Sequence, residues 1–333
     1  MLQSYWDQGH ILLHDVEPGP LKPGWVRLKV AGCGICGSDL HRYRRANGIS
    51  PGQGTPGHEL VGTVMQSESP LADLLYAVEP WVSCRKCDYC LSGQRQFCRS
   101  GYLVGVQIAG GLSEFVDVPL ESLHPIDPSV ATLQASLSEP TAVCTRAIHH
   151  AQLQLDNRVL ILGGGTLGLL FGLLARDSSA KVAVTTRYPH QAEAAKRMGL
   201  QPLTESEVDG WAADNEPDVV IETVGGEADT VNQAMQAARP GGRIVVVGLF
   251  SKPLEIDGRA LVMKELRLIG SKVMGVGDHE SEFRTATNLL PRYREEYKAL
   301  QTHQFPLDRI GDAFAAAADK TSQSIKVTVL AGA

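Results

Sequence analysis

The chain has 333 residues, of which 43% are hydrophobic and 20% are charged, and its net charge is −6 at pH 7. This length is enough for two domains, and the acidic balance argues against a nucleic-acid partner, which would require a basic surface. The N-terminus lacks a basic segment followed by an apolar core, and the longest apolar run, residues 159–175, is broken by three consecutive glycines. We therefore expect a cytoplasmic protein with no membrane partner.

The first 140 residues predict a domain rich in short strands and loops. Residues 25–30, with the sequence WVRLKV, alternate between apolar and polar side chains and follow Pro20, Pro23 and Gly24. Such alternation after turn residues is typical of a half-buried strand. Residues 61–64 and 115–118 show a similar pattern.

Residues 141–272 predict strands that alternate with helices, which is typical of a doubly wound parallel sheet in an α/β fold. The expected strands are residues 158–162, 181–186, 218–222, 243–249 and 266–271. The expected helices are residues 141–151, a segment ending at 176, and residues 190–198, 227–238 and 258–264. From residue 273 to 333 the pattern is mixed, with one helix near 312–318 and a final strand at 324–330.

Four of the seven cysteines fall within fifteen residues, in the order Cys84-x-x-Cys87-x-x-Cys90-x7-Cys98. Four thiolates in tetrahedral geometry suit zinc and leave no open position for a substrate, so this set predicts a structural zinc site. Chance clustering or disulfides are the alternatives. Cysteines grouped as metal ligands also indicate a reducing compartment.

A glycine-rich turn follows the strand at 158–162. Gly163, Gly165 and Gly168 are spaced as G-x-G-x-x-G, and Thr166 and Leu167 stand where the next helix opens. In a strand–turn–helix context this pattern indicates a Rossmann dinucleotide site, in which the helix N-terminus faces a pyrophosphate. The alternative is a turn with a structural role only.

The acid expected on the cofactor ribose is missing, because no Asp or Glu occurs in residues 181–192. Thr186 and Arg187 stand at the end of the second strand instead. A threonine could donate a hydrogen bond to a ribose 2′-phosphate and an arginine would attract it. The sequence therefore favours NADP over NAD, unless Arg187 is simply a solvated surface residue.

A second group of potential metal ligands is spread along the chain. Residues 34–41 read GICGSDLH, residues 57–59 read GHE, and residues 138–140 read SEP. Each motif is ambiguous by itself. A lone His58 is more often a hydrogen-bonded polar residue than a ligand, and a lone Glu139 before proline is usually a cap or loop residue.

Taken together and in this order, these motifs, the four cysteines and the glycine-rich turn resemble the zinc-containing medium-chain alcohol and polyol dehydrogenases. The resemblance extends over nearly the whole chain. It implies a GroES-like catalytic domain, formed by residues 1–140 and 273–333, and a Rossmann NAD(P)-binding domain at 141–272. It also implies a homodimer or homotetramer, and two zinc ions per chain.

The resemblance also implies roles at a catalytic zinc. Cys36 and His58 would be ligands, with Glu139 as the third, and Glu59 could replace or exchange with a ligand. Asp39 would hydrogen-bond the ring of His58 and fix its tautomer. The four cysteines of the Cys84–Cys98 segment would hold the structural zinc.

The expected reaction is hydride transfer from a zinc-bound alcohol to the nicotinamide. Ser38 would accept the hydroxyl proton and His41 would pass it to solvent, although a plain turn serine and an exposed histidine are the alternatives. Ligands bind beyond the carboxyl ends of parallel strands, so Val224, Gly248 and Leu249 should line the cofactor.

The implied substrate is a small molecule, namely a secondary alcohol, polyol or sugar-type alcohol, or the matching ketone. Its pocket would include positions near Tyr43, Tyr102 and Met274. Two rival readings are a zinc-independent reductase of enones or quinones and a non-enzymatic nucleotide-binding protein. Cys33 and Cys144 match no ligand position and are expected to be small buried thiols.

Overall fold

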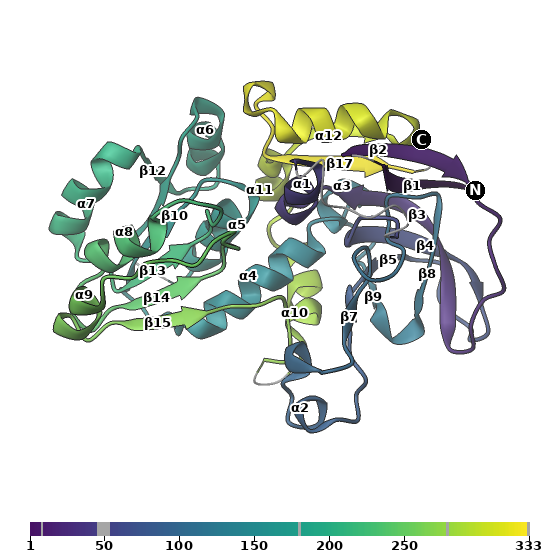
Figure 1. The fold of residues 1–333 in the computed structure, drawn as a ribbon, viewed down its shortest axis with the longest axis horizontal. Helices are drawn as coiled ribbons and strands as arrows, with labels where there is room; N and C mark the ends of the chain where they lie inside the picture. The colour runs from purple at the N-terminus through teal and green to yellow at the C-terminus, as the bar shows by residue number, and fades with distance from the viewer. Residues whose placement is uncertain (8, 45–53, 179–180, 278–279, 332–333) are drawn as a thin grey trace. The chain divides into compact units, whose positions relative to one another are not determined.

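The computed structural model describes residues 1–7, 9–44, 54–178, 181–277 and 280–331. The chain divides into two compact units (Figure 1). One unit comprises Met1–Ala142 together with Met274–Ala333, and the other comprises Val143–Val273. The sequence placed these boundaries after residues 140 and 272.

The first unit is built on a seven-stranded sheet with the order β16-β17-β3-β4-β5-β9, in which β8 also pairs with β3. Strand β17 comes from the C-terminal segment and pairs antiparallel with β3 through Val329 and Cys33. The far end of the chain thereby reaches the strand that leads into Cys36. The strands are β3 (Trp25–Gly34), β4 (Glu59–Ser67), β5 (Leu75–Val78), β8 (Phe115–Pro119), β9 (Leu123–Pro125), β16 (Gln301–Pro306) and β17 (Lys326–Leu330).

Strand β3 shows why these residues form this sheet. Val26, Leu28 and Val30 are at most 1% exposed and alternate with more accessible residues, as a strand with one face on the core requires. The strand continues beyond residue 30 to Gly34. The alternating pattern does not reveal this extension, because the last three residues of the strand are all buried.

Smaller elements surround this sheet. An N-terminal hairpin, β1 (Leu2–Asp7) and β2 (His10–Asp15), packs on helix α12, and β6 (Trp81–Val82) pairs with β7 (Tyr102–Leu103) at the base of the cysteine lobe. The helices are α1 (Gly37–Arg44), α2 (Asp88–Leu91), α3 (Thr132–Ala135), α10 (Glu282–Leu289), α11 (Arg294–Leu300) and α12 (Ile310–Ala318). Helix α4 (Ser138–Ala151) contains the boundary between the units.

The second unit is a six-stranded parallel sheet with the order β12-β11-β10-β13-β14-β15. The chain runs outward from β10 to β12 and then returns to β13, so the order reverses between β10 and β13. That reversal is the switch point at which doubly wound sheets bind ligands. The strands are β10 (Arg158–Leu162), β11 (Lys181–Thr185), β12 (Gln201–Leu203), β13 (Val219–Glu222), β14 (Arg243–Val246) and β15 (Arg267–Gly270).

The central strands β10 and β13 are mostly apolar and almost completely buried, although β10 begins with Arg158 and β13 ends with Glu222, as expected for a parallel sheet covered on both faces. Helix α5 packs on β10 and β11, and α8 packs on β13 and β14. The helices are α5 (Thr166–Arg176), α6 (Pro189–Arg197), α7 (Val208–Asn215), α8 (Thr230–Ala237) and α9 (Gly258–Met263). Within the described ranges, no helix is long and apolar enough to cross a membrane.

Candidate functional site

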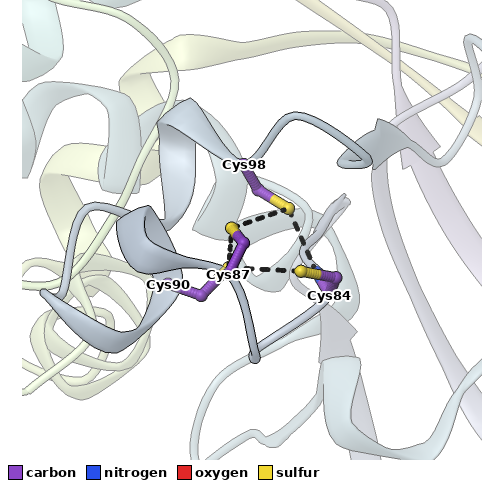
Figure 2. A group of neighbouring side chains, drawn as sticks. All are labelled: Cys84, Cys87, Cys90 and Cys98. Carbon is purple, nitrogen blue, oxygen red and sulfur yellow. Dashed lines mark hydrogen bonds between the residues drawn. The ribbon is translucent and has the colours of Figure 1, made fainter.

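The four cysteines of the lobe converge on one point (Figure 2). The Sγ atoms of Cys84 and Cys90 are 3.9 Å apart, those of Cys87 and Cys90 are 3.5 Å apart, and those of Cys87 and Cys98 are 3.9 Å apart. A tetrahedron of sulfurs around zinc, with Zn–S near 2.3 Å, has edges of about 3.8 Å. A disulfide requires about 2.05 Å, and all four thiols are free. The lobe geometry therefore fits a closed zinc site.

The protonation of the lobe thiols also favours a bound cation. Hydrogen bonds from the backbone N–H groups of Lys86 and Cys87 lower the pKa of Cys84 to about 6. Burial and a hydrogen bond to Cys87 raise the pKa of Cys90 to about 11. The backbone thus stabilises some thiolates while their neighbours resist ionisation, and a dication at the centre would relieve this conflict.

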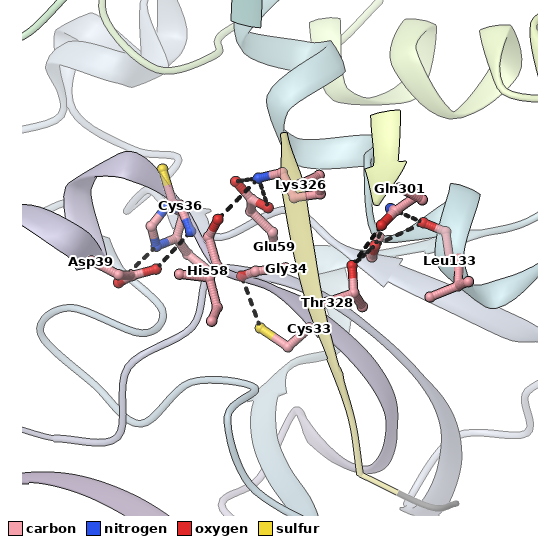
Figure 3. Close-up of polar contacts among 12 residues, drawn as sticks. Cys33, Gly34, Cys36, Asp39, His58, Glu59, Leu133, Gln301, Lys326 and Thr328 are labelled. Carbon is pink, nitrogen blue, oxygen red and sulfur yellow. Dashed lines mark hydrogen bonds and ion pairs between the residues drawn. The ribbon is translucent and has the colours of Figure 1, made fainter. Parts of the chain in front are cut away.

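A second group of donors forms in the first unit (Figure 3). Cys36 immediately precedes α1, and His58 immediately precedes β4, which begins at Glu59. The ligand atoms of Cys36, His58 and Glu59 lie within 4.8 Å of one another. A sulfur, an imidazole nitrogen and a carboxylate oxygen are all donors that zinc accepts.

His58 supports the presence of a cation at this centre. Its ring is 4% exposed, and its Nδ1 atom is buried without a hydrogen-bond partner. Burial alone would lower the pKa of His58, but the negative charges of Cys36 and Asp39 outweigh it and raise the pKa well above its usual value. The site thus attracts positive charge, and its residues fit a zinc ion.

Asp39 does not make the expected hydrogen bond to His58. The distance from Asp39 Oδ1 to His58 Nδ1 is 4.0 Å, which is too long for a hydrogen bond. The other carboxylate oxygen accepts from the backbone N–H of Cys36 at 3.1 Å. Asp39 therefore fixes the loop that carries Cys36, and it acts on His58 through its charge.

Glu59 is held by a residue that the sequence did not reveal. Lys326 Nζ lies 2.8 Å from Glu59 Oε1 and 2.6 Å from Oε2, and it also donates to the carbonyl of Ile35 at 3.1 Å (Figure 3). Both side chains are at most 3% exposed. Because Lys326 lies on β17, 267 residues from Glu59, no local motif could have indicated this pair.

Glu139 lies outside the group formed by Cys36, His58 and Glu59. It stands in the first turn of α4 and is 7% exposed. Burial raises the pKa of Glu139 to about 7, and its charge in turn raises the pKa of His58 and Lys326. Glu139 is therefore close enough to the centre to act on it through its charge.

The expected proton-transfer residues lie on α1. Ser38 is partly buried in the first turn, directly before Asp39, whereas His41 is exposed one turn later. Of the positions expected near the substrate, Met274 is completely buried, and Tyr43 is partly buried and packs on Phe314. Cys33 and Cys144 are completely buried cysteines with reduced thiols, as expected.

The glycine-rich turn has a backbone that other residues could not easily adopt. Gly163 has a φ of +110°, and a Cβ on Gly168 would lie 1.7 Å from the carbonyl oxygen of Gly163. A Cβ on Gly165, by contrast, would meet no atom within 4 Å. The first and third glycines thus serve the turn and the helix contact, and Gly165 leaves open space before α5, which Thr166 and Leu167 begin.

Thr186 and Arg187 differ in their availability to a ligand. Thr186 is 8% exposed, and its hydroxyl donates to the carbonyl of Leu203 at 3.4 Å. Arg187 is exposed, and its backbone N–H donates to Gln191. Of the two residues expected near a ribose phosphate, only Arg187 presents its side chain to solvent.

The loops after β13 and β14 are organised by Glu222, which the sequence pattern indicates only as the last residue of a strand. Its Oε1 atom accepts hydrogen bonds from the N–H groups of Val224 at 2.7 Å and Gly225 at 2.9 Å, and from the hydroxyl of Thr230 at 2.8 Å. A Cβ on Gly248 would lie 2.4 Å from Glu222 Oε2. This packing leaves Val224 47% exposed and the neighbouring Leu249 71% exposed, available to a bound cofactor.

Two family models match the chain in succession. The model of the alcohol dehydrogenase GroES-like domain matches residues 22–128, and the model of the zinc-binding dehydrogenase matches residues 166–292. The first match includes Cys36, His58, Glu59 and the four cysteines of the lobe. The second begins with the helix that follows the glycine-rich turn.

Characterised relatives align over most of the chain. A 2-dehydro-3-deoxy-L-galactonate 5-dehydrogenase of Pseudoalteromonas atlantica is 30% identical over 314 residues, which are 91% of this chain and 89% of the relative. A D-arabitol-phosphate dehydrogenase of Enterococcus avium is 26% identical over 328 residues, with coverages of 92% and 89%.

Solved structures share the fold over the full length. A short chain alcohol dehydrogenase from Escherichia coli, complexed with NADH, has a TM-score of 0.89 at 26% identity and covers 99% of each chain. A putative zinc-binding dehydrogenase from Sinorhizobium meliloti, bound to NADP, has a TM-score of 0.87 at 27% identity, with coverages of 99% and 98%. Together with the family models, these likenesses confirm the predicted fold class.

Proposed function

The chain belongs to the zinc-type medium-chain alcohol and polyol dehydrogenases, and from this premise we propose that it oxidises a secondary hydroxyl of a polyol or sugar-type alcohol, or reduces the matching ketone. As a member of this family it is a zinc-dependent oxidoreductase that transfers hydride between a CH–OH group and NAD(P). The finer proposal adds NADP as the favoured cofactor and two zinc ions per chain.

One observation carries the proposal. Cys36 and His58 converge beside the buried carboxylate of Glu59, whose negative charge is already balanced by Lys326. Because Lys326 occupies both oxygens of Glu59, Glu59 is poorly placed to serve as a permanent ligand. We assign the catalytic zinc to Cys36, His58 and Glu139, with Glu59 as a neighbour that can exchange. This set leaves room for a substrate oxygen, as catalytic zinc sites require.

A zinc ion held by these residues would supply Lewis-acid polarisation of the substrate oxygen, and a bound nicotinamide would supply the hydride acceptor. The residues of the chain position the zinc ligands and transfer the proton. Asp39 holds the loop of Cys36 in place through its backbone N–H and stabilises positive charge on His58. Ser38 accepts the proton of the substrate hydroxyl, and the exposed His41 passes it to solvent. The four lobe cysteines hold the second zinc and take no part in the reaction.

The preference for NADP rests on Arg187. No acid stands in residues 181–192 to repel a 2′-phosphate, and Arg187 is exposed near the end of β11. The hydroxyl of Thr186 already has an acceptor, so the arginine supplies most of the discrimination. Arg187→Ala should weaken NADPH binding about tenfold or more, the scale of a charge-assisted hydrogen bond, and leave NADH binding nearly unchanged. Arg197→Ala on α6 is the matched surface control.

The relatives support a substrate derived from a sugar, since one acts on a galactonate derivative and another on an arabitol phosphate. We further propose that the chain forms a homodimer or homotetramer. Strand β15 is at the edge of its sheet, and Val262 and Met263 on the preceding helix are about 70% exposed. An open strand edge beside apolar side chains is suited to pairing with a second copy.

Metal analysis combined with cofactor titration tests the proposal directly. Zinc content per chain and the dissociation constants of NADPH and NADH are measured on one purified sample. We expect two zinc ions per chain and tighter binding of NADPH. A single zinc would remove the catalytic assignment, and tighter binding of NADH would overturn the reading of Arg187.

A further inference from the structure

Arg42 on helix α1 extends the row of residues that leads away from the candidate catalytic zinc. Cys36, Asp39 and Arg42 are spaced by three residues, and α1 starts from the Cys36 carbonyl, which accepts from the N–H of Asp39 at 3.1 Å. Residues three apart lie on one face of a helix, and helical side chains lean toward the N-terminus. The side chain of Arg42 therefore extends back toward Asp39, whose carboxylate contacts the loop of Cys36.

The guanidinium of Arg42 has unused hydrogen-bonding capacity. Among the described residues, its buried Nη1 atom has no hydrogen-bond partner, and Arg42 forms no ion pair. A buried donor of a charged group without an acceptor is costly. This cost suggests that an acceptor from outside the chain completes the site.

The anionic groups nearby are already engaged. Asp39 accepts from the N–H of Cys36 with one oxygen and faces His58 with the other. The charge of Arg42 reaches Asp39, because it helps to lower the pKa of that carboxyl against the larger effect of burial. Lys326, the other cation at the centre, is fully occupied by Glu59 and the Ile35 carbonyl. Of these two cations, Arg42 alone is left for a ligand.

We propose that Arg42 binds an anionic group of the substrate, a carboxylate or a phosphate, so that the enzyme acts on acidic polyols in preference to neutral ones. The planar guanidinium matches either oxyanion with two parallel hydrogen bonds. Arg42 lies six positions after Cys36, an axial rise of about 9 Å along a helix, so the anion lies some carbons away from the reacting hydroxyl. This inference rests on the proposed function and deepens it to a substrate class.

The experiment uses zinc-loaded full-length protein with its nicotinamide cofactor and two matched probe pairs. Galactitol is compared with L-galactonate, and D-arabitol with D-arabitol phosphate, by calorimetric binding and by steady-state kinetics. Wild-type protein should bind at least one anionic probe about tenfold or more tighter than its neutral twin. Arg42→Met should abolish that difference, mainly through KM, and Arg42→Lys should restore part of it. Arg284→Met, at an exposed arginine of the same unit, is the control.

The outcomes separate the two levels of the proposal. If neither anion binds wild-type protein more tightly than its neutral twin, or if Arg42→Met weakens both members of a pair equally, the role of Arg42 is overturned. If no probe is turned over although the cofactor binds, the proposed function loses support. Calorimetric binding of the anionic and neutral probes then still shows whether Arg42 binds an anion. Zinc content and thermal unfolding of each variant show whether it is folded, and Arg42→Lys serves should Arg42→Met fail to fold.

Discussion

The two groups of metal donors are built in opposite ways. The lobe takes all four of its candidate ligands from the fifteen residues from Cys84 to Cys98, and at least one of its thiols, Cys84, is stabilised as a thiolate by local backbone N–H groups. The donors of the other centre come from the loop before α1 and the start of β4, and the C-terminal strand β17 supplies the lysine that pairs with Glu59. A local site can form once its own loop closes, whereas the distributed site exists only when the whole first unit has folded.

The electrostatics differ in the same way. In the lobe the charges are near solvent, and the pair between Arg85 and Glu121, at 3.0 Å, is more than 40% exposed on both sides. At the distributed centre Glu59 and Lys326 are almost completely buried. Removing one partner of a buried ion pair costs much more stability than removing one partner of an exposed pair. Breaking the Glu59–Lys326 pair should therefore destabilise the protein more than breaking the Arg85–Glu121 pair.

The largest effect is expected on turnover from Cys36→Ser. Loss of this thiolate should abolish activity and remove one of two zinc ions per chain, since the hydroxyl of serine is a much poorer ligand for zinc. The fold should persist, because Cys36 lies in a loop and carries little of the core. Activity and zinc content are measured together, and normal turnover would remove Cys36 from the ligand set.

Lys326→Met should cause the largest loss of stability. It leaves the buried carboxylate of Glu59 without a counter-charge, which typically costs about 3–5 kcal/mol. Urea unfolding measures the loss, with Lys298→Met as the control, because Lys298 pairs with Glu295 at the surface and should contribute less than about 1 kcal/mol. The double variant Lys326→Met/Glu59→Gln should recover much of the loss. If Lys326→Met and Lys298→Met lowered the free energy of unfolding equally, burial would not determine how much each ion pair contributes to stability.

Cys90→Ser should have an intermediate effect that is confined to the lobe. It removes a ligand from the closed site, so the lobe should lose its zinc and open locally. We expect one zinc per chain, a lower melting temperature and a smaller loss of stability than for Lys326→Met. Limited proteolysis should cut the variant between residues 84 and 98. An unchanged melting temperature would count against a structural zinc.

The contrast between the two sites also explains how much could be predicted from the sequence. Cysteine spacing and the glycine-rich turn are local, so the lobe and the β10–α5 turn follow from a few adjacent residues. Most strands of the parallel sheet were found because they are apolar runs between turns. Strand β12 was missed because it has three residues and contains Pro202, and proline argues against a strand.

The parts that could not be predicted depend on long-range contacts. Lys326 is an ordinary lysine in the sequence and becomes significant only when β17 pairs with β3. Glu222 carries no signal for the three hydrogen bonds that it accepts from the next loop and helix. The hydrogen bond expected between Asp39 and His58 depends on side-chain placement within about an ångström, a scale that residue spacing does not specify. Helices α10 and α11 lie in a segment without clear periodicity and take their place from packing in the first unit.

The smallest effect is expected from Glu121→Gln, which breaks the exposed pair with Arg85. An exposed ion pair contributes at most about 1 kcal/mol, because water screens both charges and two long side chains lose freedom. The variant should keep two zinc ions, full turnover and a midpoint of urea unfolding close to that of the unmodified protein. Any loss should shrink further at high salt, where screening is stronger, whereas the loss from Lys326→Met should persist there. A large decrease in the free energy of unfolding from Glu121→Gln that does not depend on salt would mean that the lobe depends on a buried contact. The lobe would then not be a locally built site, and the contrast with the distributed site would be wrong.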